Sequence, residues 1–567
     1  MKFKDYPYTR PDLQQIEKEM KSLKERLENA KSYEEFRQAF FDSDELNARI
    51  MTQSEIANVR HTIDTRDEFY KEEADYLDEI SPVISNLQAE LAKVVLNSPY
   101  VDELKKEVPH TWFAIYENFL KSMSPEIIED MQKENKLASE YQKLVASAQI
   151  EFDGKTYTLA SLEEKMNDKD CTVRERAHKA YWGWFADHEK ELGDIYDQLV
   201  KVRHGMAQKL GYENFIPVGY LRMNRMDYDQ NDVEVYRKNV LKDVVPAAMA
   251  LYRRQAKRLN TEGDRLPVWN EKVEFESGNP NPIHSLDEMV DLAQNMYHDL
   301  SPQTGEFFDH MKDEGLLDLK ATPGKAAGGY CTGFITYKRP FIFANCNGTQ
   351  GDVEVLTHEA GHAFQCWSSR DIRPIDVFWP TSESAEIDSM SMEFFTWPWM
   401  EDFFGDRADQ YRFVHLSGAV KFIPYGVLVD HFQHEVYAHP EWNNDQRMAC
   451  WRELEKQYLP QKDYTGIDFL ERGGWWMRQL HIFLDPFYYI DYTLAQVVAL
   501  QFWNRMMKKD PKAFEDYKAI CNAGGTKSFR ELVELANLKV PFEDGCLSET
   551  MDTVSNWLEN QDVTRFE

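Results

Sequence analysis

Apolar residues recur at helical spacing along most of the chain, which predicts a mainly α-helical protein. The segment PDLQQIEKEMKSLKERLENA, from Pro11 to Ala30, sets one apolar stripe among alternating charges. This pattern is typical of a solvated helix with one buried face. Similar charged helical text continues to about residue 200, and the chain contains no fixed-period repeat and no low-complexity linker. We therefore expect an elongated helical body.

One region, Gly324 to Thr349, breaks the helical pattern. It is rich in glycine, aromatic and β-branched residues and has no helical period, which predicts two or more short strands with turns, a small β-sheet just before the next helix. Glycines in a strand pattern mark close approach of another backbone. We therefore predict that Gly328 and Gly329 bind an extended peptide at the sheet edge; a tight turn packed on the helix is the alternative.

The length of 567 residues is too great for one compact core. We predict an N-terminal helical region, residues 1–210, and a second region, residues 211–567, with the boundary near Gly211 to Phe215. The most apolar long segment, Pro486 to Trp503, contains Asp491 and Gln496. It therefore predicts a buried helix and not a membrane span.

The charge of the chain narrows the choice of partners. Acidic residues outnumber basic ones 98 to 66, for a formal net charge of −32. Such a field repels nucleic acid and anionic membrane surfaces, and it serves solubility or favours basic or zwitterionic substrates. The seven scattered cysteines include no Cys-x-x-Cys pair, which predicts free thiols in a reducing compartment. Because the N-terminus MKFKDYPYTRPDLQQ has no apolar core of a signal peptide, we expect a soluble, cytoplasmic protein.

The stretch VEVLTHEAGHAFQCW carries a candidate metal site. His358 and His362 are four residues apart, so on a helix both imidazoles lie on one face. Glu359 is the next residue after His358, about 100° further round the helix. From there its carboxylate can reach a water on a bound ion without binding the ion itself. Gly361 leaves room for close backbone approach, although glycine costs a helix about 1 kcal/mol relative to alanine. Two unrelated histidines on an ordinary helix are the alternative.

A catalytic zinc ion needs a third protein ligand and one open position. The text HAFQCWSS after His362 lacks the glycine and third histidine of the metzincins, which excludes that class. Further along, WPTSESAEIDSMSMEFFTW supplies Glu383, Glu386 and Glu393 at spacings of three and seven residues. All three share one helical face, so the spacing supplies a carboxylate without choosing among them.

Together these stretches resemble the zinc oligopeptidases of the thimet oligopeptidase and oligoendopeptidase F family. The resemblance lies in HEAGHAFQ and EIDSMSME and covers roughly residues 200 to 550. It implies one Zn²⁺ per chain, held by His358, His362 and Glu386, with Glu359 as general base and later general acid. It also implies two helical subdomains around a deep groove. Family members hydrolyse internal bonds of short unstructured peptides.

The resemblance extends to HIFLDPFYYIDYTLAQVVALQFW, where the family places a histidine and tyrosines facing the zinc. It implies that Tyr492 stabilises the oxyanion and that His481 hydrogen-bonds the substrate. Tyr489, three residues before Tyr492 on the same helical face, is a second candidate. The spacing from His481 to Tyr492 needs a small gap against thimet-type members, so the match is looser here.

Two further acids and a second pair of histidines also need an assignment. Asp388 and Glu393 are both candidates to orient the ligating imidazoles, and the sequence does not separate them. The pair His431 and His434 fits neither His-Glu-x-x-His nor His-x-x-Glu-His, so we predict a structural helix surface there.

Two other functions stay open. A zinc exopeptidase is one. The Gly-x-Met-Glu-Asn anchor usual in aminopeptidases is missing, whereas a dipeptidyl carboxypeptidase is compatible with the same residues. A non-enzymatic helical binding protein is the other. The sequence does not predict an oligomeric state.

Overall fold

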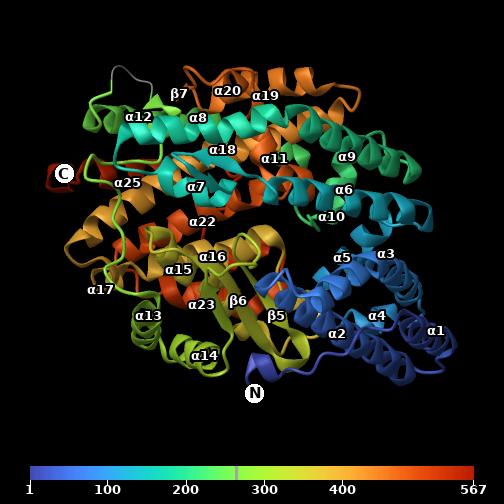
Figure 1. Ribbon diagram of the computed structural model, residues 1–567. Helices are drawn as coiled ribbons and strands as arrows, with labels where there is room; N and C mark the ends of the chain where they lie inside the picture. Colours follow the sequence, from blue (N-terminus) through green and yellow to red (C-terminus); the bar gives the residue numbers. More distant parts are fainter. Residues whose placement is uncertain (262–265, 567) are drawn as a thin grey trace.

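The computed structural model describes residues 1–261 and 266–566. Helices dominate it (Figure 1), which confirms the prediction of a mainly α-helical fold. Within the described ranges, no helix combines the length and apolar character needed to cross a membrane.

The N-terminal part consists almost entirely of helices. They are α1 (Leu13–Asn29), α2 (Tyr33–Ile63), α3 (Glu68–Leu96), α4 (Val101–Leu104), α5 (His110–Ser122), α6 (Ile128–Ala146), α7 (Leu159–Met166), α8 (Cys171–Asp187) and α9 (Glu189–Lys209). Helix α1 confirms the helix predicted for residues 11–30. The Asp12 side chain accepts a hydrogen bond from the Gln15 backbone N–H and caps its first turn.

The remaining helices include those that carry the predicted site residues. They are α10 (Phe215–Arg222), α11 (Gln230–Asn239), α12 (Val245–Arg258), α13 (Leu286–Leu300), α14 (Pro302–Asp313), α15 (Gln350–Ser369), α16 (Ser382–Phe395), α17 (Met400–Phe404), α18 (Ala408–Ala438), α19 (Asn444–Tyr458), α20 (Asp468–Glu471), α21 (Leu480–Leu484), α22 (Tyr489–Met507), α23 (Ala513–Ala523), α24 (Phe529–Leu535) and α25 (Cys546–Glu559).

The largest sheet lies beside α15 and has the strand order β4-β6-β5. Its strands are β4 (Leu317–Lys320), β5 (Tyr330–Phe334) and β6 (Arg339–Cys346); β5 is antiparallel and β4 parallel to β6. Strands β5 and β6 confirm the strands predicted between residues 324 and 349, with the zinc-motif helix directly after them. Strand β4 lies outside that range and was not predicted.

Two further small sheets among the described residues make the prediction of a single sheet incomplete. Strand β3 (Leu266–Pro267) pairs in parallel with β7 (Lys462–Asp463), and β1 (Ile150–Phe152) pairs with β2 (Lys155–Tyr157) in an antiparallel hairpin. The hairpin interrupts the region predicted to be helical up to residue 200. Its turn residues, Asp153 and Gly154, both have positive φ, the conformation that Asp-Gly favours in a two-residue hairpin.

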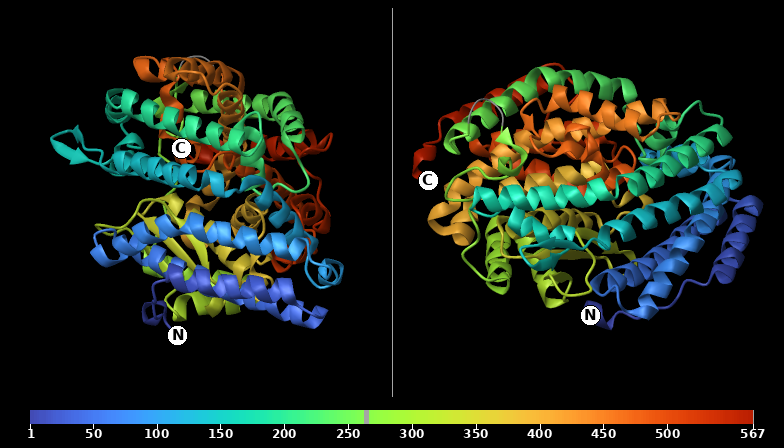
Figure 2. Two further views of the ribbon diagram at one scale, coloured as in Figure 1. Left: turned by 90° about the vertical axis from the view of Figure 1, so that its right-hand side faces the viewer. Right: turned by 45° about the horizontal axis from the view of Figure 1, so that its top comes forward.

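The helices form two parts with the candidate site between them. Figures 1 and 2 show the N-terminal helices, in blue, and the β4-β6-β5 sheet in one part, and α8, α12 and α19 in the other. Helices α15, α16 and α22 lie between these parts (Figure 1). A large core of buried apolar residues draws on the chain from Phe3 to Phe566, and a smaller one comes mainly from α1 to α5. The boundary near Gly211 stays a prediction.

Helix α22 is the buried helix predicted from Pro486 to Trp503. It begins at Tyr489, and its residues from Thr493 to Leu500 are buried. The charge of Asp491 is accommodated by a buried ion pair, in which Arg225 Nη2 lies 3.0 Å from Asp491 Oδ1 and both side chains are fully buried. Pairing offsets the cost of removing the carboxylate from water.

Candidate metal centre

Helices α15 and α16 make an unusually close contact at Gly361. A Cβ atom on this residue would lie 2.5 Å from the carbonyl oxygen of Asp388 and 2.6 Å from Cα of Ser389. Since both are backbone atoms, neither can swing away. Glycine at this position therefore sets the distance between the helix with the two histidines and the helix with the candidate glutamates. The sequence predicted a close backbone approach at Gly361 but not which segment approaches.

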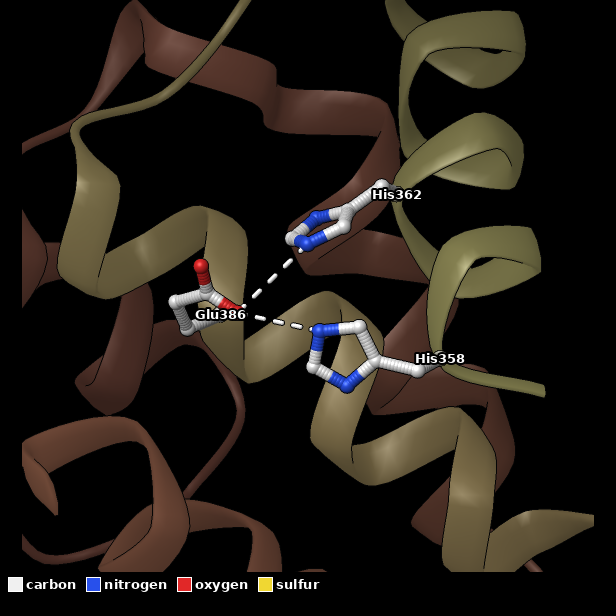
Figure 3. A group of neighbouring side chains, drawn as sticks. All are labelled: His358, His362 and Glu386. Atoms are coloured by element: carbon white, nitrogen blue, oxygen red, sulfur yellow. Dashed lines mark ion pairs between the residues drawn. The ribbon is translucent and has the colours of Figure 1, made fainter. Parts of the chain in front are cut away.

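Three predicted ligands converge across this contact. The Nε2 atoms of His358 and His362 each lie 3.4 Å from Glu386 Oε2 (Figure 3), and the three candidate donor atoms all lie within 4.8 Å of one another. Two ligands of a tetrahedral zinc ion, at bond lengths of about 2.0–2.2 Å, are about 3.4 Å apart. The structure thus selects Glu386 from the three glutamates, and the donor set fits zinc.

The charges at this point also favour a cation. Glu386 is 3 % exposed; burial alone would raise its pKa, but the interactions with His362 and His358 outweigh burial and hold that pKa well below the usual range. The carboxylate is therefore ionised, and it faces two imidazole nitrogens. A divalent ion among these three donors would satisfy all of them.

The other nitrogen of His358 is held by Glu393. His358 Nδ1 lies 2.6 Å from Glu393 Oε1, and because an ionised carboxylate only accepts, Nδ1 carries a hydrogen, which leaves Nε2 as the nitrogen that would bind a metal. Glu393 Oε2 lies 2.6 Å from His415 Nε2. Burial would raise the pKa of Glu393, but hydrogen bonds from His358 and His415 lower it to about 2. Of the two candidate acids, it is Glu393 that contacts the imidazole of a candidate ligand, His358.

Asp388 faces away from the imidazoles. Its Oδ1 accepts a hydrogen bond from Cys521 Sγ at 3.4 Å, and its backbone oxygen accepts one from the Tyr517 hydroxyl at 2.8 Å. Burial raises its pKa well above the usual value. Asp388 therefore helps to attach α16 to α23.

Glu359 lies beside the metal donors with a carboxylate oxygen to spare. It is 8 % exposed, and its Oε2 has no hydrogen-bond partner among the described residues. Burial raises its pKa above the usual value, which makes it a better proton acceptor. A Cβ atom on Gly329 would lie 3.7 Å from Glu359 Oε1, so Gly329 passes directly over this carboxylate. Gly328 precedes it with φ of +92°, a conformation that favours glycine.

Tyr488, directly before α22, contacts one of the same donors, and the Tyr492 ring lies next to it. The Tyr488 hydroxyl donates to Glu386 Oε1 at 3.0 Å, and the Tyr492 hydroxyl lies 3.3 Å from His481 Nε2. The Tyr489 ring packs at the rings of His481 and Tyr492, at centroid distances of 5.0 and 5.4 Å. The predicted residues His481, Tyr489 and Tyr492 are thus brought together, and Tyr488 joins them without having been predicted.

The turn that presents these tyrosines is held from outside the site. Phe487 has φ of +68°, a strained conformation for a bulky residue. Its backbone N–H donates to Gln433 Oε1 at 3.0 Å, and its carbonyl oxygen accepts from Arg225 at 2.5 Å. Arg225 also binds Asp491. One guanidinium therefore fixes both ends of the segment that contains Tyr488.

The second histidine pair, His431 and His434 on α18, forms hydrogen bonds with tyrosines. His434 Nε2 lies 2.9 Å from the Tyr220 hydroxyl, and His431 Nδ1 lies 3.0 Å from the Tyr458 hydroxyl. The two therefore bind to surrounding tyrosines rather than to each other.

The fold and this donor set define a helical protein with a candidate divalent-metal centre. Residues 165–552 match the model of peptidase family M3, and residues 3–123 match the peptidase M3 N-terminal domain. The chain belongs to peptidase family M3.

Individual relatives agree with this assignment. The chain is 46 % identical to a solved structure named Pz peptidase A with an inhibitor, with a TM-score of 0.96 over 99 % of this chain and 100 % of the other. It is 45 % identical to a structure named oligoendopeptidase F from Bacillus anthracis, with a TM-score of 0.92 over 100 % and 99 %. A curated relative, the oligoendopeptidase F homolog of Borreliella burgdorferi, is 21 % identical over 66 % of this chain, and the match spans 62 % of that relative's length.

Proposed function

We propose that the protein is a zinc-dependent endopeptidase that hydrolyses internal bonds of short, unstructured oligopeptides. The observation that carries this proposal is the position of Glu386 Oε2, 3.4 Å from Nε2 of both His358 and His362. Beside it lies a carboxylate oxygen of Glu359 that has no hydrogen-bond partner in the described part of the chain. Membership of peptidase family M3 supports a peptide substrate.

His358, His362 and Glu386 would hold the zinc ion. When bound, zinc supplies a Lewis acid that lowers the pKa of water towards about 7 and polarises a carbonyl oxygen. Glu393 keeps the hydrogen of His358 on Nδ1, so that Nε2 is available as a ligand. Tyr488 orients Glu386 through the oxygen that does not face the histidines.

Glu359 accepts a proton from the attacking water and later delivers it to the leaving amine. Its raised pKa suits both steps, because a stronger base takes the proton and a carboxylic acid returns it. Tyr492 donates its hydroxyl hydrogen to the substrate carbonyl oxygen as negative charge develops there. His481 and Tyr489 bind the substrate beside Tyr492.

The substrate approaches Glu359 along the edge strand β5. Gly328 and Gly329 immediately precede this strand, and Gly329 passes over the Glu359 carboxylate. Without side chains there, an extended peptide can lie close to the backbone. We place the substrate groove between the two helical parts, and we retain the expectations of a cytoplasmic location, peptide partners, and no binding to nucleic acid or membrane.

A peptide blocked at both ends tests the proposal. The purified protein is incubated with an internally quenched peptide that is acetylated and amidated, before and after treatment with a chelator and after addition of zinc. We expect chelator-sensitive cleavage inside the peptide, restored by zinc, and about one zinc per chain by metal analysis. Cleavage confined to peptides with a free end would replace the endopeptidase by an exopeptidase. A protein without bound zinc and without hydrolysis would overturn the proposal.

A further inference from the structure

A chain of four hydrogen bonds leads to the Tyr492 hydroxyl from outside the metal centre. Trp475 Nε1 lies 3.3 Å from Tyr425 Oη, and Tyr425 Oη lies 2.6 Å from Gln479 Oε1. Gln479 Nε2 lies 2.9 Å from His481 Nδ1, and His481 Nε2 lies 3.3 Å from Tyr492 Oη. The chain thus joins α18, the segment before α21, and α22.

The direction of the first two bonds follows from the donors available. An indole N–H only donates, so the Tyr425 oxygen accepts from Trp475, and its own hydrogen goes to Gln479 Oε1. If the Gln479 amide were turned round, its NH₂ group would also donate to the Tyr425 oxygen. The Tyr425 hydrogen would then face no acceptor among the described residues, so this arrangement is disfavoured.

The same reasoning fixes the hydrogen on His481. Gln479 Nε2 is a donor, so His481 Nδ1 accepts and carries no hydrogen. Burial lowers the pKa of His481 to about 4, so the imidazole is neutral at neutral pH. Its one hydrogen is therefore on Nε2, and it points to the Tyr492 oxygen.

We infer that Gln479 is a positioning residue, which fixes the His481 tautomer and so leaves the Tyr492 hydroxyl hydrogen free for the substrate oxyanion. This inference rests on the proposed function. The hydroxyl group of a tyrosine carries one hydrogen. With the hydrogen of His481 on Nε2, the Tyr492 oxygen accepts from the imidazole and its own hydrogen can be donated elsewhere. With the other tautomer, His481 Nε2 would take that hydrogen and compete with the substrate.

Gln479→Glu tests the inference with almost no change in shape. A carboxylate at this position accepts from the Tyr425 hydroxyl and also from His481 Nδ1–H, so it reverses the tautomer. We expect kcat to fall by about 10- to 100-fold, somewhat less than the loss of a whole oxyanion donor, with little change in KM, since the interaction forms in the transition state. Gln457→Glu, the same change at an exposed position on α19, should leave both constants unchanged.

A double-mutant cycle separates positioning from general disruption. In a Tyr492→Phe background, Gln479→Glu should cost nothing further, because no hydroxyl hydrogen is left to position. An equal loss of kcat with and without the Tyr492 hydroxyl would overturn the inference, as would a wild-type kcat for Gln479→Glu.

Nitrogen NMR of ¹⁵N-histidine-labelled protein determines which nitrogen of His481 carries the hydrogen, and it does not require the protein to be active. The His481 signals are identified from their absence in His481→Asn. We expect the hydrogen on Nε2 in the wild type and on Nδ1 in Gln479→Glu; a wild-type hydrogen on Nδ1 refutes the inference. Because this measurement does not need peptide cleavage, it tests the hydrogen-bond chain even if the proposed endopeptidase activity fails.

Discussion

Gly361→Ala adds a single methyl group at the point where α15 meets α16. That carbon would lie 2.5 Å from the Asp388 carbonyl oxygen and 2.6 Å from Ser389 Cα. Ordinary contact between such atoms is about 3.5 Å, so the two helices have to separate by roughly 1 Å. Metal–ligand distances tolerate only about 0.2 Å. The added methyl group should therefore move both histidines too far from Glu386.

The effect on stability should be smaller than the effect on zinc binding. Overpacking lowers the free energy of unfolding by about 1–3 kcal/mol, and replacing glycine by alanine inside a helix raises it by about 1 kcal/mol. The two partly cancel. Zinc affinity, in contrast, should fall at least about tenfold, as it does when an orienting partner of a ligand is lost.

Competition with a coloured chelator measures the zinc affinity of Gly361→Ala, and thermal unfolding of the chelator-treated protein measures its stability. Gly418→Ala is the matched control: Gly418 lies on α18 and is exposed, and beyond its own stretch of helix an added Cβ would meet no atom of the described residues within 4 Å. We expect the control to bind zinc normally and to be slightly more stable. If Gly361→Ala binds zinc as tightly as the wild type, the close helix contact does not set the ligand geometry.

Three more predictions follow from the same structure. Glu359→Gln should keep its zinc and lose at least about 100-fold in kcat; a metal-loaded variant with the wild-type rate would exclude Glu359 as the base. Glu393→Gln should weaken zinc binding by about 10- to 100-fold in chelator competition, whereas wild-type affinity would show that His358 needs no carboxylate partner. Burial would raise the pKa of Glu134, but ion pairs with Arg222 and Arg203 lower it to about 2, so its stabilising effect is complete above its usual pKa of 4.5 and is lost as the pH falls to 2. Urea unfolding should therefore show Glu134→Gln to be less stable than the wild type near pH 6 by on the order of 3 kcal/mol, with the difference shrinking below pH 4.5; a constant difference would contradict this assignment.

The parts of the site that local spacing determines could be predicted from the sequence. His358 and His362 share a helical face whatever the rest of the chain does, and the cost of Gly361 in a helix already indicated a close neighbour. The spacing left three glutamates open, because all lie on one face of α16. The family resemblance implied Glu386 as a ligand, and the position of α16 against α15 brings Glu386 to the histidine Nε2 atoms and Glu393 to His358 Nδ1.

Other parts depend on contacts between distant segments, which a single sequence does not reveal. His415 reaches Glu393 from α18, and Gln479 lies beside Tyr425 only because α18 and the segment before α21 pack together. The β1–β2 hairpin was missed for a different reason. Its strands are three residues each, too short to show a period against the surrounding helices, although its Asp-Gly turn was a usable signal.

Two tyrosines at the start of α22, Tyr488 and Tyr489, show how little separates a predicted site residue from a missed one. Tyr489 is the first residue of α22 and shares a face with Tyr492, as the sequence predicted; Tyr488, whose backbone angles are also helical, lies four residues before Tyr492. The positive φ of Phe487 ends that regularity one residue before Tyr488, whose hydroxyl then reaches Glu386. A strained phenylalanine persists only where its surroundings hold it, and here Arg225 binds its carbonyl oxygen and pairs with Asp491 in the next turn. The buried acid that looked out of place in an apolar helix thus anchors the guanidinium that holds the turn before Tyr488.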